Sequence, residues 1–249
     1  MKRIVSTLLL VVTSALAQYE TNQNEPIFQE HLGLYLSANL GLFYTTETNI
    51  FNVESSIDDS KSTEEFSGVL SLLDLRCGKS FNNIVSFYGV AGLGYGIGSY
   101  EEKDEEKNIG QQDENYSFKE NNNDIFRILF GGGGEFYPIQ DKGNPLYGSF
   151  IGINAGFVVD IIQMTEHDHN QVYKDSSTVI APVDIYCKFE FGKEWRLSRL
   201  WNYGFALNYT IGKLESKQGN LYNHTKKTIY SETVSHTSHT FGLAFRVSH

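Results

Sequence analysis

The sequence predicts an all-β fold, an eight-stranded antiparallel up-and-down transmembrane β-barrel. Three observations lead to this prediction: eight segments alternate between apolar and small or polar residues, long and short connections alternate between them, and the glycines of one segment share a face. Successive side chains of a strand point to opposite faces of the sheet. Each segment therefore has one apolar face and one face of small, polar or charged residues.

The segment 88–100 shows the two faces most clearly. Gly92, Gly94 and Gly96 alternate there with Leu93 and Tyr95. Glycine weakens a strand and adds no side chain to a core. An eight-stranded barrel has room inside only for packed side chains, so we expect the glycine face to point inward and leave space for larger neighbours. The apolar face then meets lipid, the reverse of a soluble ligand-binding barrel.

The first half of the chain contains three further segments of this kind, in addition to 88–100. Segment 31–44 has leucine at even positions with glycine, serine and asparagine between them. In segment 68–78, valine and leucine alternate with glycine, aspartate and arginine. In segment 125–137, phenylalanine and isoleucine alternate with glycine, arginine and glutamate. Together with 88–100 these segments predict four strands.

The second half of the chain supplies four more segments. Isoleucine and phenylalanine alternate with glycine, asparagine and aspartate in 147–161, and with aspartate, lysine and glutamate in 179–192. Segment 201–212 alternates aromatic and aliphatic residues with asparagine, glycine and threonine, and 239–249 ends the chain with the same pattern. The even total of eight strands, each about ten residues or longer, is typical of an outer-membrane barrel.

The connections between the eight segments alternate in length. Those after the first, third, fifth and seventh strands are long and polar, and we expect them to be loops, at 45–65, 101–123, 163–177 and 215–235. Those after the second, fourth and sixth strands are short. In an up-and-down meander the odd connections lie at one end and the even ones at the other. One end of the barrel is therefore expected to carry long loops and the other tight turns.

The N-terminal residues predict export. A positive start, a short apolar run and a small-residue cleavage pattern make 1–17 a secretory signal peptide. We expect a short N-terminal segment at 18–29 and one barrel domain at 30–249, without a separate periplasmic domain. Cys77 and Cys187 fall far apart in the strand map and are expected to be free thiols.

The charge of the chain excludes one class of partner. The formal net charge is −10, with acid concentrated in 101–114, and no basic groove for nucleic acid is present. We interpret this acidic run as a solvated loop. The chain is therefore not expected to bind nucleic acid.

These features resemble the small eight-stranded bacterial outer-membrane barrel family, typified by outer membrane protein X and the transmembrane domain of outer membrane protein A. The resemblance covers nearly all of 30–249 and consists of the signal peptide, the eight alternating strands and the C-terminal strand that ends the chain. It implies a porin-like cell-envelope protein in the outer membrane of a Gram-negative-type bacterium. The partners that it implies are outer-membrane lipid, lipopolysaccharide and the barrel assembly machinery. It implies no activity.

The inward positions carry charges of both signs, and charges away from water need partners. We therefore expect a plug of ion pairs in the barrel interior. The alternative is a narrow gated channel in which such pairs rearrange. The expected interior network consists of Asp74, Arg76, Arg127, Glu135, Asp160, Asp184, Lys188, Glu190 and Arg246.

Two clusters suggest chemistry, and we expect neither to perform it. The run 166–169, Glu-His-Asp-His, has metal-ligand residue types, but crowded neighbours in a loop seldom converge on one ion, so no metal and no cofactor are expected. His236 and Ser238 share a face and suggest a lipid-acting enzyme. By the expected register that face points inward, and Asn208 and Thr210 on the preceding strand offer no carboxylate.

The sequence therefore predicts a non-enzymatic surface barrel that anchors long acidic extracellular loops for surface interaction or envelope integrity. The surface ligand is not specified by the sequence. The first alternative is a small solute channel or transporter, and the second is the lipid-acting outer-membrane enzyme.

Overall fold

The computed structural model describes residues 33–55, 58–108, 114–167, 174–180, 183–198, 200–223 and 228–249. The expected signal peptide and N-terminal segment lie outside these residues. The strands are β1 (Gly33–Ser55), β2 (Asp58–Phe81), β3 (Val85–Asn108), β4 (Glu114–Phe136), β5 (Ser149–His167), β6 (Lys174–Ile180), β7 (Asp184–Arg196), β8 (Asn202–Asn223) and β9 (Thr228–Ser248). Within the described residues, no helix is long and apolar enough to cross a membrane.

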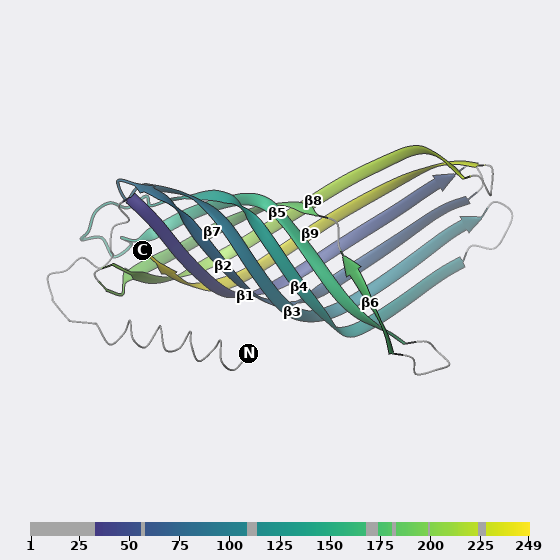
Figure 1. Ribbon diagram of the computed structural model, residues 1–249, viewed down its shortest axis with the longest axis horizontal. Helices are drawn as coiled ribbons and strands as arrows, with labels where there is room; N and C mark the ends of the chain where they lie inside the picture. Colours follow the sequence, from purple (N-terminus) through teal and green to yellow (C-terminus); the bar gives the residue numbers. More distant parts are fainter. Residues whose placement is uncertain are drawn as a thin grey trace.

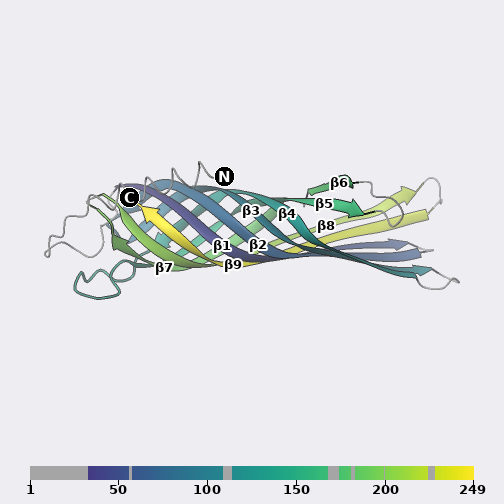
Figure 2. The same ribbon diagram turned by 90° about the horizontal axis from the view of Figure 1, so that it is seen from below.

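Eight of these strands close a ring (Figures 1 and 2). Each pairs antiparallel with its neighbour in the order β1, β2, β3, β4, β5, β7, β8 and β9, and β9 pairs back onto β1. The expected all-β, eight-stranded antiparallel barrel is therefore confirmed. Closure gives every ring strand a partner on both sides, which removes the unpaired edges that an open sheet would leave.

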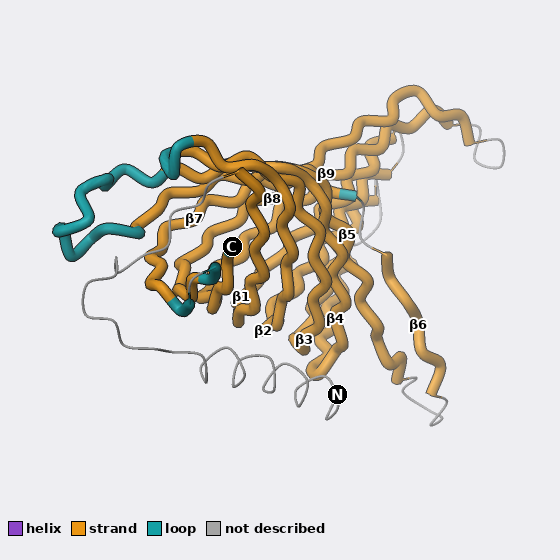
Figure 3. Tube along the Cα trace, turned by 60° about the vertical axis from the view of Figure 1, so that its left-hand side comes forward, coloured by secondary structure: helices purple, strands orange, loops and turns teal. Residues whose placement is uncertain are grey.

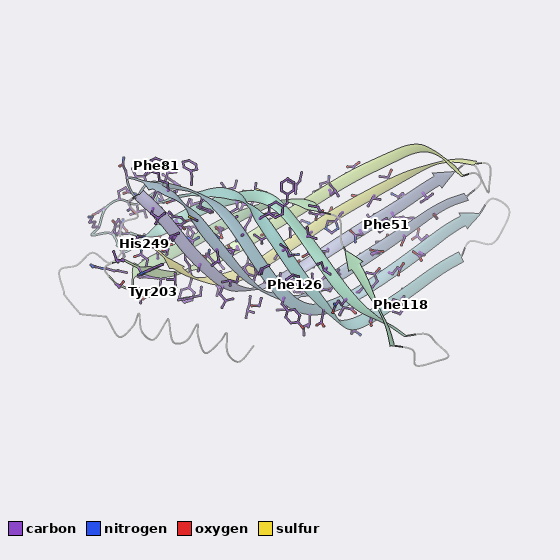
Figure 4. The ribbon with its side chains drawn as sticks, viewed as in Figure 1. Phe51, Phe81, Phe118, Phe126, Tyr203 and His249 are labelled. Carbon is purple, nitrogen blue, oxygen red and sulfur yellow. The ribbon has the colours of Figure 1, made fainter. Side chains whose placement is uncertain are left out.

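One end of the ring has short connections, as expected. Asn82 and Asn83 both have positive φ, 51° and 55°, and the amide of Ile84 donates to the carbonyl of Phe81 at 3.0 Å. Two consecutive residues of this kind form the tight turn whose twist matches antiparallel strands. Figure 4 shows Phe81, Tyr203 and His249 together at this end, and we call it the turn end.

The prediction of long polar loops at the opposite end is wrong for most of their length. The β1–β2 ladder continues from Thr45↔Gly68 to Glu54↔Asp59, and the acidic run continues β3 as far as Asn108. β8 and β9 likewise stay paired out to Asn223↔Thr228. These segments form long hairpin arms that extend the wall beyond the apolar part of the barrel (Figure 1). Backbone pairing, rather than a continuous apolar face, extends these strands, because most of their residues are polar and the few apolar ones, such as Ile50 and Val53, do not form an unbroken alternation.

The sixth expected strand is divided in two, which corrects the prediction of one strand over 179–192. β6 pairs with β5 from Ile161↔Ile180 to His167↔Lys174, and β7 takes over from Val158↔Asp184. The β5–β7 pairing is offset by one residue from the β5–β6 pairing, so the register shifts between the two ladders. Figure 3 shows β6 and the end of β5 diverging from the other arms.

The outer face of the ring is apolar over about half the length of each long strand. On β3 it runs from Phe87 to Ile97 and includes Leu93 and Tyr95, which are 55% and 50% exposed. These eleven positions match the 9–11 residues that a tilted strand needs to cross a bilayer. Beyond Ile97 the outer positions become polar and charged. Cys77 and Cys187 are free thiols.

The inner face confirms the expected role of the glycines and adds a layer that we did not expect. A Cβ on Gly92 or Gly94 would lie about 3 Å from the side chains of Leu129 and Leu70, so the glycines leave the space that these leucines fill. The interior is nevertheless not only small and ionised. A buried apolar cluster occupies part of it and includes Phe43, Leu70, Leu72, Leu129, Val158 and Tyr186.

Candidate functional site

Charged side chains from opposite walls meet inside the barrel near the turn end. We call this the lower cluster, and its members are Asp74, Arg76, Glu135, Lys188, Glu190, Glu194 and Arg246. All seven are buried, with exposures of 4% or less. Each points inward because it lies on the face opposite the apolar one in its strand.

Arg76 is the first centre of the lower cluster. Its Nη1 lies 2.6 Å from both Glu135 Oε1 and Glu190 Oε2, and its Nε lies 2.9 Å from Asp74 Oδ1. Lys188 Nζ adds contacts to Asp74 at 2.8 Å and to Glu190 at 3.2 Å. Five ionised groups thus share contacts of hydrogen-bond length, which are stronger than neutral ones.

Arg246 is the second centre. It forms an ion pair with Glu135, places Nη1 3.1 Å from Glu194 Oε1, and donates from Nε to Asn39 Oδ1 at 2.7 Å. Its guanidinium carbon lies 4.2 Å from the ring centroid of Phe150, a cation–π distance. Arg246 itself is fully buried, so almost its whole side chain is in contact with protein.

Neutral donors complete the lower cluster. The hydroxyl groups of Tyr35 and Tyr137 donate to Glu135 Oε2 at 2.9 and 3.2 Å, and the Asn154 amide donates to Glu190 at 3.1 Å. With these residues and Tyr88, seven of the eight ring strands contribute to the cluster, namely β1, β2, β3, β4, β5, β7 and β9.

The contacts of the lower cluster span the barrel. In the ring order, β2 and β7 are four strands apart in either direction, and so are β4 and β9. The Arg76–Glu190 and Arg246–Glu135 pairs therefore join diametrically opposite walls. The lower cluster thus bridges the interior from wall to wall at this level.

An upper cluster lies about 25 Å further along the strands, since Arg127 and Glu135 are eight residues apart on β4 and a strand rises about 3.3 Å per residue. Arg127 Nε lies 2.7 Å from Asp160 Oδ1, and its Nη2 lies 2.6 Å from Glu47 Oε1. Arg127 Nη1 also donates to the hydroxyl of Thr240 at 2.9 Å. Because Thr240 is on β9, this contact too joins opposite walls.

A histidine group lies near the upper cluster. His236 Nε2 is 2.6 Å from Asp184 Oδ2, and His236 Nδ1 contacts the side-chain oxygen of Asn49. The preceding strand offers no carboxylate, as expected, but Asp184 on β7 reaches His236 past the intervening strand β8, a carboxylate partner that we did not expect. Both ring nitrogens have partners, whereas a nucleophilic Ser238 would need one of them as its base. This geometry is not that of an activated serine.

The nine expected network residues thus fall into three places. Asp74, Arg76, Glu135, Lys188, Glu190 and Arg246 meet in the lower cluster, Arg127 and Asp160 meet in the upper cluster, and Asp184 pairs with His236. Glu47 and Glu194 were missed, although both fall on the inward face of their strands. Their period-two offset from Asn39 and Glu190 was the signal that could have found them.

The metal-type run 166–169 lies outside the residues whose side chains are described. In the part of the chain that the structure describes, no group of three or more His, Cys, Asp or Glu residues could hold a metal ion.

The comparisons with known proteins concern architecture only. No protein-family model matches the chain, and no curated protein matches it. Among solved structures, the outer membrane protease OmpT from Escherichia coli is 9% identical, with 87% of this chain and 97% of that chain covered and a TM-score of 0.39.

Two further solved structures are similar to the same extent. The outer membrane protein OprG from Pseudomonas aeruginosa is 11% identical, with 88% and 97% covered and a TM-score of 0.40. Ail, the attachment invasion locus protein of Yersinia pestis, is 11% identical, with 86% and 99% covered and a TM-score of 0.34. The fold of this chain is therefore assigned from its own strand pairing.

Proposed function

We propose that this protein is a non-conducting surface barrel of a bacterial outer membrane, which anchors the polar arms on the outer side. Membrane residence is supported by the outer face of the ring. Apolar side chains such as Leu42, Phe87 and Phe191 are 60–66% exposed there, and a soluble monomer rarely exposes so continuous an apolar surface. A closed ring also satisfies the backbone groups that hydrocarbon cannot.

The non-conducting character is supported by one observation, the contact between opposite walls. Arg76 and Arg246 each contact a carboxylate on the diametrically opposite strand within a fully buried cluster. Opening a pore would require separating these ion pairs in a medium of low dielectric, which is costly because each charge would lose its partner.

The surface role is supported by the arms. About eleven residues of β1 extend beyond Tyr44, the last exposed apolar residue on that strand, which corresponds to about 36 Å of extended chain. The outer positions there are mostly polar, with Ile50 as the exception, and the β3 arm carries Glu101, Glu102 and Glu105. Such arms present carboxylates to the medium, where they can bind lipopolysaccharide-associated cations or a neighbouring surface.

The test is single-channel recording after reconstitution of the full chain in a planar bilayer. We expect no step conductance for the wild-type protein at moderate voltage. A matched variant, Arg76→Ala combined with Arg246→Ala, removes the two arginines that join opposite walls in the lower cluster and should produce small conductance steps. Conductance in the wild type that equals that of the double variant would overturn the proposal in favour of a solute channel.

A further inference from the structure

The lipid-facing wall contains a groove of about 710 Å³ that the proposed function does not explain. It crosses β1 to β4 near the turn end, and its sides include Leu75, Phe130 and Trp201. Its floor is formed by short residues on the outer face, namely Ala38, Cys77, Gly89 and Ala91.

Packing within the protein does not account for the glycine in this floor. A Cβ on inward-facing Gly96 or Gly131 would come within 3.0 Å of a neighbouring backbone, so those positions tolerate no side chain. A Cβ on Gly89 would find no atom closer than 3.9 Å. The missing side chain at Gly89 therefore leaves space on the outside of the wall that a side chain could fill without a clash.

The chemistry around the groove is that of a lipid. Exposed apolar side chains such as Phe87 and Leu93 border it, so it is continuous with the apolar belt. Lys79 follows Cys77 on the outer face of β2, about 7 Å toward the turn end, and its Nζ lies 5.3 Å from the ring centroid of Phe81. A cation with an aromatic neighbour at this height is suited to a headgroup phosphate.

We propose that the groove binds one acyl chain of a glycerophospholipid from the leaflet at the turn end, with the lipid phosphate at Lys79. An added strand is excluded as the occupant because β2 and β3 are paired on both sides at Cys77 and Gly89. The inference rests on the proposed residence of the barrel in a membrane.

The experiment counts bound lipid on the full chain. Wild-type protein and variants are purified in a mild detergent, shown to be folded by heat-modifiable migration on a gel, and mixed with phosphatidylglycerol for native mass spectrometry. Ala91→Trp fills the groove. Ser71→Trp is the matched control, because Ser71 is exposed on the outer face of β2 but does not line the groove.

We expect the wild type and Ser71→Trp to retain one lipid, and Ala91→Trp to lower its occupancy at least tenfold. Lys79→Gln should lower it several-fold. If Ala91→Trp does not fold, Cys77→Leu fills the same floor. Equal lipid retention in the groove-filling variant and the control would overturn the inference.

Two other outcomes are distinguishable. Loss of a dimer in Ala91→Trp with unchanged lipid retention would make the groove an interface between copies and also overturn the inference. A wild-type chain without heat-modifiable migration would instead overturn the proposed membrane barrel itself.

Discussion

Arg246 shows how much a single interior charge can contribute to this barrel. It contacts Glu135 and Glu194 and stacks on Phe150, and all of these groups are buried. Removing the cation takes one ion-pair partner from each of two buried carboxylates, Glu135 and Glu194, of which Glu135 keeps its contact with Arg76. The cost arises from the charges left behind, since the pair itself contributes little beyond the desolvation it must offset.

We therefore expect Arg246→Leu to lower the free energy of unfolding by about 3–5 kcal/mol. The measurement is the urea midpoint of the barrel in lipid vesicles, followed by heat-modifiable migration. Lys119→Gln serves as the control because the Lys119 side chain is 60% exposed on an arm, and it should change stability by no more than about 0.5 kcal/mol. An Arg246→Leu midpoint equal to that of the control would contradict the interior assignment.

Two neighbouring glutamates on the β3 arm should titrate differently. The hydrogen bond and charge of Lys103 hold the pKa of Glu101 below its ordinary value, whereas burial, Asp104 and Glu64 raise the pKa of Glu102 above it. The Glu101 contribution to arm stability is thus present above its unfolded pKa and lost as pH falls through the lower folded one. The Glu102 effect has the opposite sign, because protonation removes a partly buried charge and its repulsion by Asp104 and Glu64.

A carboxyl-carbon NMR titration of the folded protein checks this difference. Glu101 should titrate at lower pH than Glu102, and Lys103→Gln should bring the two midpoints closer by raising that of Glu101. If the difference between the two titration midpoints is the same in Lys103→Gln as in the wild type, Lys103 does not act on Glu101.

At the residue scale, the sequence predicts inward charges well and their partners poorly. Asp74 and Arg76 are identified because they interrupt an apolar alternation. The Asp184–His236 pair was missed because the two residues lie on strands that are not adjacent. Period two gives the face of a side chain, but only ring closure gives the residue that it meets across the interior.

At the scale of the strand, the glycines of β3 have two different roles. Inward Gly96 lies against the backbone of Val69 and Leu70, whereas a Cβ on outward Gly89 would meet no atom closer than 3.9 Å. Sequence alternation separates the two faces but does not show which glycine is required by packing, since that depends on the distance to the neighbouring strand.

This difference gives a matched pair of variants. Gly96→Ala should lower the free energy of unfolding by about 1–3 kcal/mol, because the added methyl group meets backbone that cannot move away. Gly89→Ala should leave it unchanged or raise it by up to about 1 kcal/mol, because alanine loses less backbone entropy on folding. Urea midpoints of the two variants check the prediction, and equal destabilisation would mean that Gly96 does not face the interior.

The arms are the elements that sequence analysis described incorrectly. Segments such as 45–65 and 101–123 lack an apolar face, so a hydrophobic pattern reports them as loops. In the structure, continuous backbone pairing with β2, β4 and β9 carries them as strands. What makes these segments strands is their pairing with equally long polar segments of the neighbouring strands.

At the scale of the whole molecule, both the proposed membrane residence and the interior ion pairs depend on which face of the strands points outward. Apolar side chains such as Leu207 and Leu243 are about half exposed on the outside, and Arg127 and Glu135 are buried inside. The eight-stranded fold and this orientation could be predicted from alternation and connection length. The apolar interior layer could not, because Leu70 and Leu72 sit on the polar face of their strand.

The most direct test of this orientation is migration on a detergent gel with and without boiling. A closed barrel with an apolar exterior and an ion-paired interior resists unfolding by SDS. The unheated full chain should therefore migrate faster than the boiled chain. After boiling, only the slower band of the unfolded chain should remain. A single band at the same position before and after boiling would contradict the account.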